Sequence, residues 1–322
     1  MAFRYEGYET SRAIPNVVVD GSPNESTVLA LTHWPGIAQP PGMARDLSAQ
    51  MAFAYLDEPV PHPSAEVVTN NHFDQDGLVS IFALVEPEAA LHHRALLIDV
   101  AAAGDFATYR DRRAARTSMA LSQLASAETS LSYSDFSDQL YRELLPELLP
   151  MVLHNDRCQE LWRDEDEALT ESEAAIATGR VTIDERPDLD LAVVTIPAAE
   201  PSRSGHRFGG DGFEGIHPMA LHNATERFRV ITVHGRRYRY VDRYETWVQF
   251  RSRRVLPRID LRPLADELTA MERSSVTWRA GAPQALTPEL AHDGESSLEP
   301  ETFVGLVVSR LAGGAAGSLR TA

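Results

Sequence analysis

The sequence predicts an α/β protein, in which a mostly parallel sheet with flanking helices is followed by a smaller α+β domain. Short runs rich in valine and leucine end in polar turns near the start of the chain, and helical segments lie between several of them. This alternation is typical of parallel sheets. With 322 residues, 43% of them hydrophobic, the chain is long enough for two domains. We expect these domains to cover residues 1–185 and 186–322.

The strands expected in the first domain are short apolar runs that stop at polar residues. They cover Asn16–Val19, Thr27–Leu31 and Ala65–Thr69, and another strand-like run lies at Ala95–Ile98. In an open α/β sheet, ligands gather beyond the carboxyl ends of the strands. The polar residues that follow these strands are therefore the first candidates for a functional site.

A helical pattern replaces the strand pattern between about residues 118 and 180, where leucines recur at spacings of three and four. We expect a helical connector here, and a domain boundary near the turn at Arg186-Pro187-Asp188. The second domain carries four strand-like runs and one helix, so its sheet should be antiparallel or mixed. The strands are expected at 189–196, 229–233, 237–241 and 246–251, and the helix at 261–271.

Composition excludes several classes of function. The net charge of −17 argues against binding of long nucleic acids, but a small anionic substrate fits if positive charge is concentrated locally. No apolar run reaches the roughly 18 residues of a membrane span, and the first residues do not resemble a signal peptide, so we expect a cytoplasmic protein without membrane association. The single cysteine, Cys158, supports neither a disulfide nor a thiolate zinc site. Nothing in the sequence indicates the oligomeric state.

The strongest signal for chemistry is the alternation of His72, Asp74 and Asp76 directly after an apolar strand. Buried carboxylates need cationic partners, and this segment contains none, so a divalent ion would supply the missing charge. Carboxylate oxygens with imidazole and no thiolate favour Mn²⁺, with Mg²⁺, Fe²⁺ or Zn²⁺ as alternatives. The competing interpretation is a solvated turn in which Asp74 or Asp76 caps the following helix.

This run, His72-Phe-Asp74-Gln-Asp76-Gly77, resembles the first motif of the DHH phosphoesterase superfamily, in which a strand ends in a pattern that holds a two-metal centre. Further along, Gly104-Asp105 is similar to a later metal-binding motif of that family. The resemblance therefore implies that Asp105 is a metal ligand, and that Asp76 or Asp105 bridges two ions.

The family's Asp-His-His triplet does not follow in its usual place. Two upstream segments resemble the missing motifs instead: Val17–Asp20 is similar to the second motif, and Val28–Trp34 is similar to a degenerate third motif. That order would be a circular permutation of the sheet, with Asp20 and His33 as additional metal ligands. For His33, a packed or capped histidine is an equal alternative.

Candidate substrate-binding residues lie in the second half of the chain. Residues 227–262 contain 11 of the 30 arginines, and guanidinium groups bind phosphate in a bidentate manner. The segment around Arg251-Ser252 resembles the substrate-binding domain of the same family, which implies that Arg251, Arg253 and Arg254 bind substrate. Alternatively, these arginines pair with acidic residues. His206, in the glycine-rich loop 202–215, is a further catalytic candidate because it is placed to close over a substrate.

Taken together, these patterns predict a metal-dependent hydrolase of a small phosphorylated or nucleotide substrate. Two ions about 4 Å apart would activate water for attack on phosphorus, with His72, Asp74 and Asp76 at the catalytic centre. Two alternatives stay open at this stage. The same metal site can serve hydrolysis of an amide, ester or carbon–nitrogen bond, or the protein can be a catalytically silent metal-binding or nucleotide-binding protein.

Overall fold

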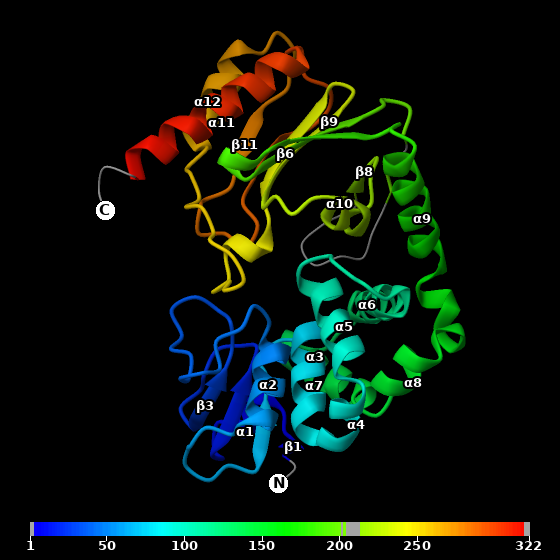
Figure 1. Ribbon diagram of the computed structural model, residues 1–322, viewed down its shortest axis with the longest axis vertical. Helices are drawn as coiled ribbons and strands as arrows, with labels where there is room; N and C mark the ends of the chain where they lie inside the picture. Colours follow the sequence, from blue (N-terminus) through cyan, green and yellow to red (C-terminus); the bar gives the residue numbers. More distant parts are fainter. Residues whose placement is uncertain (1–2, 201, 204–212, 319–322) are drawn as a thin grey trace. The chain divides into compact units, whose positions relative to one another are not determined.

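A computed structural model of the chain describes residues 3–200, 202–203 and 213–318 (Figure 1). These residues form two compact units. The first unit holds the described residues up to Glu167 together with Val248–Arg253, and the second unit holds the other described residues. Val248–Arg253, which the sequence assigned to the second domain, is therefore part of the first unit.

The first unit is built on a parallel sheet, as predicted. Its described strands are β1 (Arg4–Tyr5), β2 (Asn16–Val19), β3 (Thr27–Leu31) and β4 (Val67–Thr69), in the order β1-β4-β2-β3. Each neighbouring pair is parallel. Strands β2 and β4 are buried along their whole length, which explains their continuous valine-rich sequences, since parallel strands are covered on both faces.

Helices follow these strands along the chain and continue into the predicted connector, and the last of them extends into the second unit. They are α1 (Tyr8–Ser11), α2 (Ser48–Asp57), α3 (Gln75–Val85), α4 (Pro87–His92), α5 (Arg94–Asp105), α6 (Arg112–Ala125), α7 (Tyr133–Leu144), α8 (Leu148–Leu153), the 3₁₀ helix η1 (Asn155–Leu161) and α9 (Arg163–Ala177). The strand predicted at residues 95–98 is wrong, because this run lies in α5. Leu97, Val100 and Ala101 are buried with helical spacing, so the apolar run is one face of a helix.

The second unit contains a mixed sheet, as predicted. Its described strands are β5 (Thr182–Arg186), β6 (Leu191–Ile196), β9 (Arg229–His234), β10 (Arg237–Asp242), β11 (Trp278–Ala280) and β12 (Glu289–His292), in the order β11-β12-β10-β9-β6-β5. The pair β6–β9 is parallel and the other pairs are antiparallel. Strands β7 (Ser202–Arg203) and β8 (Phe213–Glu214) form a separate antiparallel pair.

The remaining helices of this unit are α10 (Pro218–Ala224), the 3₁₀ helices η2 (Pro187–Leu189) and η3 (Tyr244–Thr246), α11 (Arg262–Met271) and α12 (Pro300–Ser318). Leu268 of α11 and Phe303 and Val307 of α12 belong to the hydrophobic core that includes strands β6, β9 and β10. Within the described ranges, no helix is both long enough and apolar enough to cross a bilayer.

The strand predicted at residues 246–251 is also wrong, because this segment consists of the last residue of η3, a turn and irregular backbone. Its N–H groups bond to loops of the first unit instead of to a sheet. The N–H of Gln249 donates to the carbonyl of His33, and the N–H of Arg251 donates to the Asp46 carboxylate. Satisfied backbone donors do not require a strand partner.

Gly77 should not tolerate a side chain. A Cβ atom at this position in α3 would lie 2.4 Å from Asn70 Nδ2 and 2.4 Å from Tyr141 Oη. We therefore expect Gly77→Ala to lower the free energy of unfolding by about 1–3 kcal/mol, measured by chemical denaturation. Gly305→Ala is the matched control, because it also lies within a helix but has no neighbour within 4 Å. That change should stabilise by about 0.5–1 kcal/mol, and equal effects of the two changes would contradict the steric argument.

Candidate metal centre

The carboxyl ends of three parallel strands meet at one edge of the first unit's sheet. Asp20 directly follows β2, His33 follows β3 after one intervening residue, and His72 lies shortly after β4. Parallel strands bring their carboxyl ends to the same edge, so residues distant in the sequence become neighbours. The side chains that meet here are Asp20, His33, His72, Asp74, Asp76 and Asp105.

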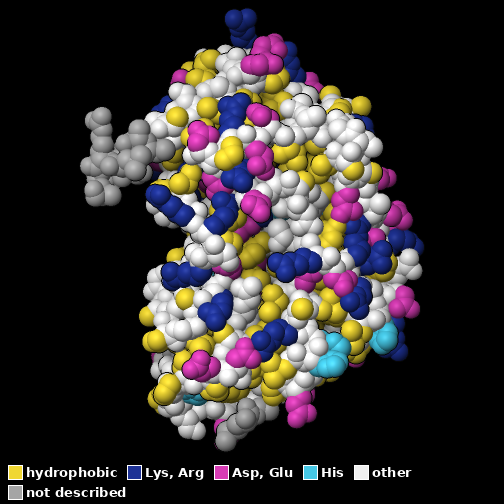
Figure 2. All heavy atoms as spheres, viewed as in Figure 1, with side chains coloured by type: hydrophobic (Ala, Val, Ile, Leu, Met, Phe, Trp, Pro, Cys, Tyr) yellow, Lys and Arg dark blue, Asp and Glu magenta, His cyan; other side chains and the backbone are white. Residues whose placement is uncertain are grey.

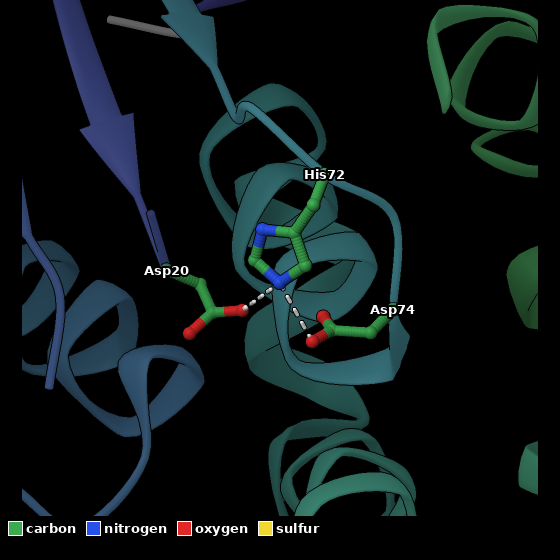
Figure 3. Close-up of side chains that lie close together, drawn as sticks. All are labelled: Asp20, His72 and Asp74. Carbon is green, nitrogen blue, oxygen red and sulfur yellow. Dashed lines mark hydrogen bonds and ion pairs between the residues drawn. The ribbon is translucent and has the colours of Figure 1, made fainter. Parts of the chain in front are cut away.

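His72 joins two of the carboxylates. Its Nε2 atom lies 2.9 Å from Asp74 Oδ2 and 3.6 Å from Asp20 Oδ2 (Figure 3). The ring is buried, and Trp34 packs beside it with ring centroids 5.2 Å apart. His72 and Asp74 therefore face Asp20 from the loop between β4 and α3.

His33 joins the other carboxylates on the opposite oxygen of Asp20. Its Nε2 atom lies 3.3 Å from Asp20 Oδ1, 3.5 Å from Asp105 Oδ2 and 3.9 Å from Asp76 Oδ2. Its Nδ1 atom lies 2.5 Å from the carbonyl oxygen of Asp46. A carbonyl can only accept, so in neutral His33 the proton sits on Nδ1 and the Nε2 lone pair faces the acids.

Two groups of three side chains can each hold a metal ion here. They are Asp20, His72 and Asp74, and Asp20, His33 and Asp76, and the ligand atoms of each group lie within 4.8 Å of one another. The donor set of carboxylate oxygens and imidazole nitrogens fits a divalent cation. The buried Oδ2 atoms of Asp20 and Asp105 lack a hydrogen-bond partner among the described residues, and a bound cation would coordinate them.

Asp20 is the residue common to both groups, with one oxygen directed to each. From the sequence, Asp76 or Asp105 was expected to bridge two ions. In the structure Asp105 approaches only the His33 side, and both oxygens of Asp76 accept backbone N–H groups of α2. The shared position therefore falls to Asp20, because it lies between the two histidines.

Burial and mutual repulsion control the charge of the site. Burial, together with the Asp74 and Asp76 carboxylates, raises the pKa of Asp20 well above its usual value. Burial and the Asp76 and Asp74 carboxylates likewise raise the pKa of Asp105 well above its usual value. Burial also raises the pKa of Asp76. Burial alone would raise the pKa of Asp74 as well, but the neighbouring His72 lowers it below its usual range. A metal ion would relieve this repulsion.

Asp74 and Asp76 both accept N–H groups at helix N-termini, but only Asp74 caps the following helix as the alternative interpretation predicted. Asp74 Oδ1 accepts the N–H of Gly77 at 2.8 Å and caps α3. Asp76 accepts the N–H groups of Ser48 and Ala49 at 2.8 and 2.7 Å and caps α2. The turn is not solvated, because Asp76 is fully buried. Each carboxylate oxygen has a second lone pair, so capping leaves both residues able to bind an ion.

Sequence reasoning missed two residues that hold the site together. Ser48, the first residue of α2, bonds to Asp20, His33 and Asp76. Asp46 orients His33 through its carbonyl and accepts the N–H groups of Arg251 and Ser252 with its carboxylate. No local pattern marks either residue, because their partners lie far away in the sequence.

The candidate substrate-binding arginines lie in different places. Arg251 and Arg253 belong to the first unit, and Arg254 belongs to the second. The Arg251 guanidinium donates to Gln39 and Gln249, and His206 lies outside the described residues. Several other arginines of the 227–262 segment pair with acids, as the alternative interpretation predicted. These pairs include Arg229–Asp242, Arg236–Glu299, Arg239–Glu289, Arg243–Glu245 and Arg262–Asp260.

Comparison with known proteins identifies a family without assigning a function. A model described as a family of unknown function matches residues 1–318. A search of the curated proteins and a search of the solved structures found no match. The chemistry of the site must therefore be inferred from its own geometry.

Asp105→Asn should stabilise the metal-free protein and weaken its metal binding. The folded pKa of Asp105 lies above the ordinary 3.8, so the native state holds more protons and loses stability as pH rises through this interval. The gain from Asp105→Asn should vanish below about pH 4 and reach at least about 1 kcal/mol at neutral pH, or roughly 2–4 °C in Tm.

Thermal unfolding in chelator across this pH range, repeated with added Mn²⁺, measures both effects. Asp156→Asn is the control, because Asp156 is exposed and should change neither the pH dependence nor the response to Mn²⁺. If wild type and Asp105→Asn lose stability in parallel as pH rises, the buried charge of Asp105 is not the cause.

Proposed function

Since the chain belongs to this family of unknown function (DUF6687), we propose a function from the site itself: a metal-dependent hydrolase that acts on a small phosphorylated or nucleotide substrate. The observation that carries the proposal is the pair of three-residue groups that share Asp20. A carboxylate with one oxygen directed to each of two histidines is suited to hold two cations side by side.

The donor set favours Mn²⁺ among the divalent ions. Four carboxylates and two imidazoles meet at the site, and Cys158 is not among them. Oxygen-rich sites with imidazole suit Mn²⁺ and Mg²⁺ better than they suit softer ions. Bound cations would lower the pKa of water and polarise phosphoryl oxygens. The ligands would be Asp20, His33, His72, Asp74, Asp76 and Asp105.

The two groups differ in access to solvent. The side chains of His33 and Asp76 are fully enclosed, whereas those of His72 and Asp74 are 8% and 13% exposed. Water and a substrate oxyanion would therefore enter from the side of His72 and Asp74. In this arrangement His72 and Asp74 would face the reacting atoms, and His33 and Asp76 would bind on the enclosed side of the site.

The segment that carries Arg251 and Arg253 is attached to the loop of His33. The segment that carries Arg251 is bound to the loop of His33 by a 2.7 Å hydrogen bond from the Gln249 N–H to the His33 carbonyl. Asp46 strengthens this attachment by accepting the N–H groups of Arg251 and Ser252. We propose that Arg251 and Arg253 stabilise negative charge on the substrate, as the resemblance to DHH phosphoesterases also suggests. A small anionic substrate and a cytoplasmic location complete the proposal.

The proposal predicts Mn²⁺-stimulated hydrolysis that depends on the Asp74 charge. The protein is screened against short oligonucleotides, cyclic dinucleotides, pyrophosphate, nucleoside phosphates and simple amides. Asp74→Asn keeps an acceptor for the Gly77 N–H and removes the charge, so it should fold normally and lose about 10²–10³-fold in turnover. Asp57→Asn is the matched control, since Asp57 pairs with the exposed guanidinium of Arg94, and it should keep full activity.

The outcomes separate the alternative functions. Turnover of phosphate esters that survives Asp74→Asn would contradict the assigned site. Turnover of amides alone would favour hydrolysis of another bond at the same centre. Binding of Mn²⁺ without turnover of any substrate in the panel would favour a catalytically silent metal-binding protein.

A further inference from the structure

Ser48 contacts three of the six residues of the candidate metal centre. Its hydroxyl donates to Asp20 Oδ1 at 2.9 Å and accepts the N–H of His33 at 3.2 Å. Its own N–H donates to Asp76 Oδ2 at 2.8 Å. The residue is fully buried at the first position of α2, so water does not compete for these bonds.

These bonds determine how the Asp20 carboxylate is rotated. With Oδ1 held by the Ser48 hydroxyl, Oδ1 lies 3.3 Å from His33 Nε2 and Oδ2 lies 3.6 Å from His72 Nε2. Rotation about the bond to the carboxylate would direct the oxygens away from the two histidines. Neighbours that orient a metal ligand in this manner commonly matter for affinity as much as the ligand's own chemistry.

We propose that Ser48 is a positioning residue that holds Asp20 in the bridging orientation, so that two ions bind as a coupled pair. The inference rests on the proposed metal centre but does not require hydrolysis. The Ser48 hydroxyl donates its hydrogen bond to Asp20 and need not contact an ion. Its N–H contributes separately by fixing Asp76, and a side-chain substitution leaves that N–H in place.

The test compares Ser48→Ala with two other variants of the full-length protein. Ser48→Thr keeps a hydroxyl on the same carbon. Ser80→Ala removes a fully buried hydroxyl in α3 that has no hydrogen-bond partner among the described residues. It therefore removes the same side-chain volume as Ser48→Ala without removing a hydrogen bond. Mn²⁺ binding is measured by calorimetry, and spin coupling between neighbouring Mn²⁺ ions is measured by electron paramagnetic resonance.

We expect wild type and Ser80→Ala to bind two ions that are spin-coupled. Ser48→Ala should lose about 10- to 100-fold in affinity and most of the coupled signal, and its melting temperature in chelator should lie below that of Ser80→Ala because two buried hydrogen bonds are lost. Ser48→Thr should recover the coupled signal. A merely structural role for Ser48 would change stability without changing the ratio of coupled to isolated Mn²⁺.

Each contrary result has a distinct meaning. Wild-type affinity and coupling in Ser48→Ala would overturn the positioning role alone. Equal loss of affinity and of the coupled signal in Ser48→Thr and Ser48→Ala, with a wild-type melting temperature for Ser48→Thr, would also overturn it, because the hydroxyl would not be the cause. A wild-type protein that binds Mn²⁺ pairs but hydrolyses nothing would overturn the hydrolase function and leave this inference intact. A wild-type protein that binds no Mn²⁺ would overturn both.

Discussion

The repulsion among four buried carboxylates is the constraint on which the first unit depends. Among the described residues, the ring nitrogens that lie against Asp20, Asp74, Asp76 and Asp105 belong to two imidazoles, those of His33 and His72. Like charges at such separations interact strongly in a medium of low dielectric constant. The apolar strands β2 and β4 and the buried faces of α3 and α5 supply the hydrophobic burial that holds these groups together. Stability is thereby exchanged for a preorganised cluster of acids and imidazoles that can hold a cation.

Helix N-termini supply part of the positive potential that the site otherwise lacks. The Asp76 carboxylate accepts N–H groups at the N-terminus of α2, and the Asp74 carboxylate accepts one at the N-terminus of α3. The partial positive charge at a helix N-terminus stabilises a carboxylate. These contacts leave Asp20 and Asp105 with buried oxygens that lack a hydrogen-bond partner among the described residues. The need for a cation is therefore concentrated between the two histidines rather than spread evenly over the acids.

The sequence predicted the strands and their polar ends because these depend on local patterns. Valine-rich runs identified β2, β3 and β4, and parallel topology then brought Asp20, His33 and His72 to one edge. The run at 95–98 was misassigned because a short apolar segment fits either a strand or a helix face. Ser48 and Asp46 were missed because their roles depend on contacts across long separations, which no periodicity encodes. For the same reason, the position of Asp20 between the two histidines became evident only from the distances.

The backbone of Asp20 restricts which amino acids can occupy this position. Its φ angle of 45° lies in the left-handed region, which glycine, asparagine and aspartate adopt most readily. Glycine provides no ligand, asparagine provides no charge, and glutamate is both longer and less suited to this conformation. The following Gly21 has no room for a Cβ, which would lie 2.2 Å from Asn71 Oδ1. Among related sequences, the Asp-Gly pair should therefore be a more selective marker of a functional site than the histidines, for which other nitrogen or oxygen ligands can substitute.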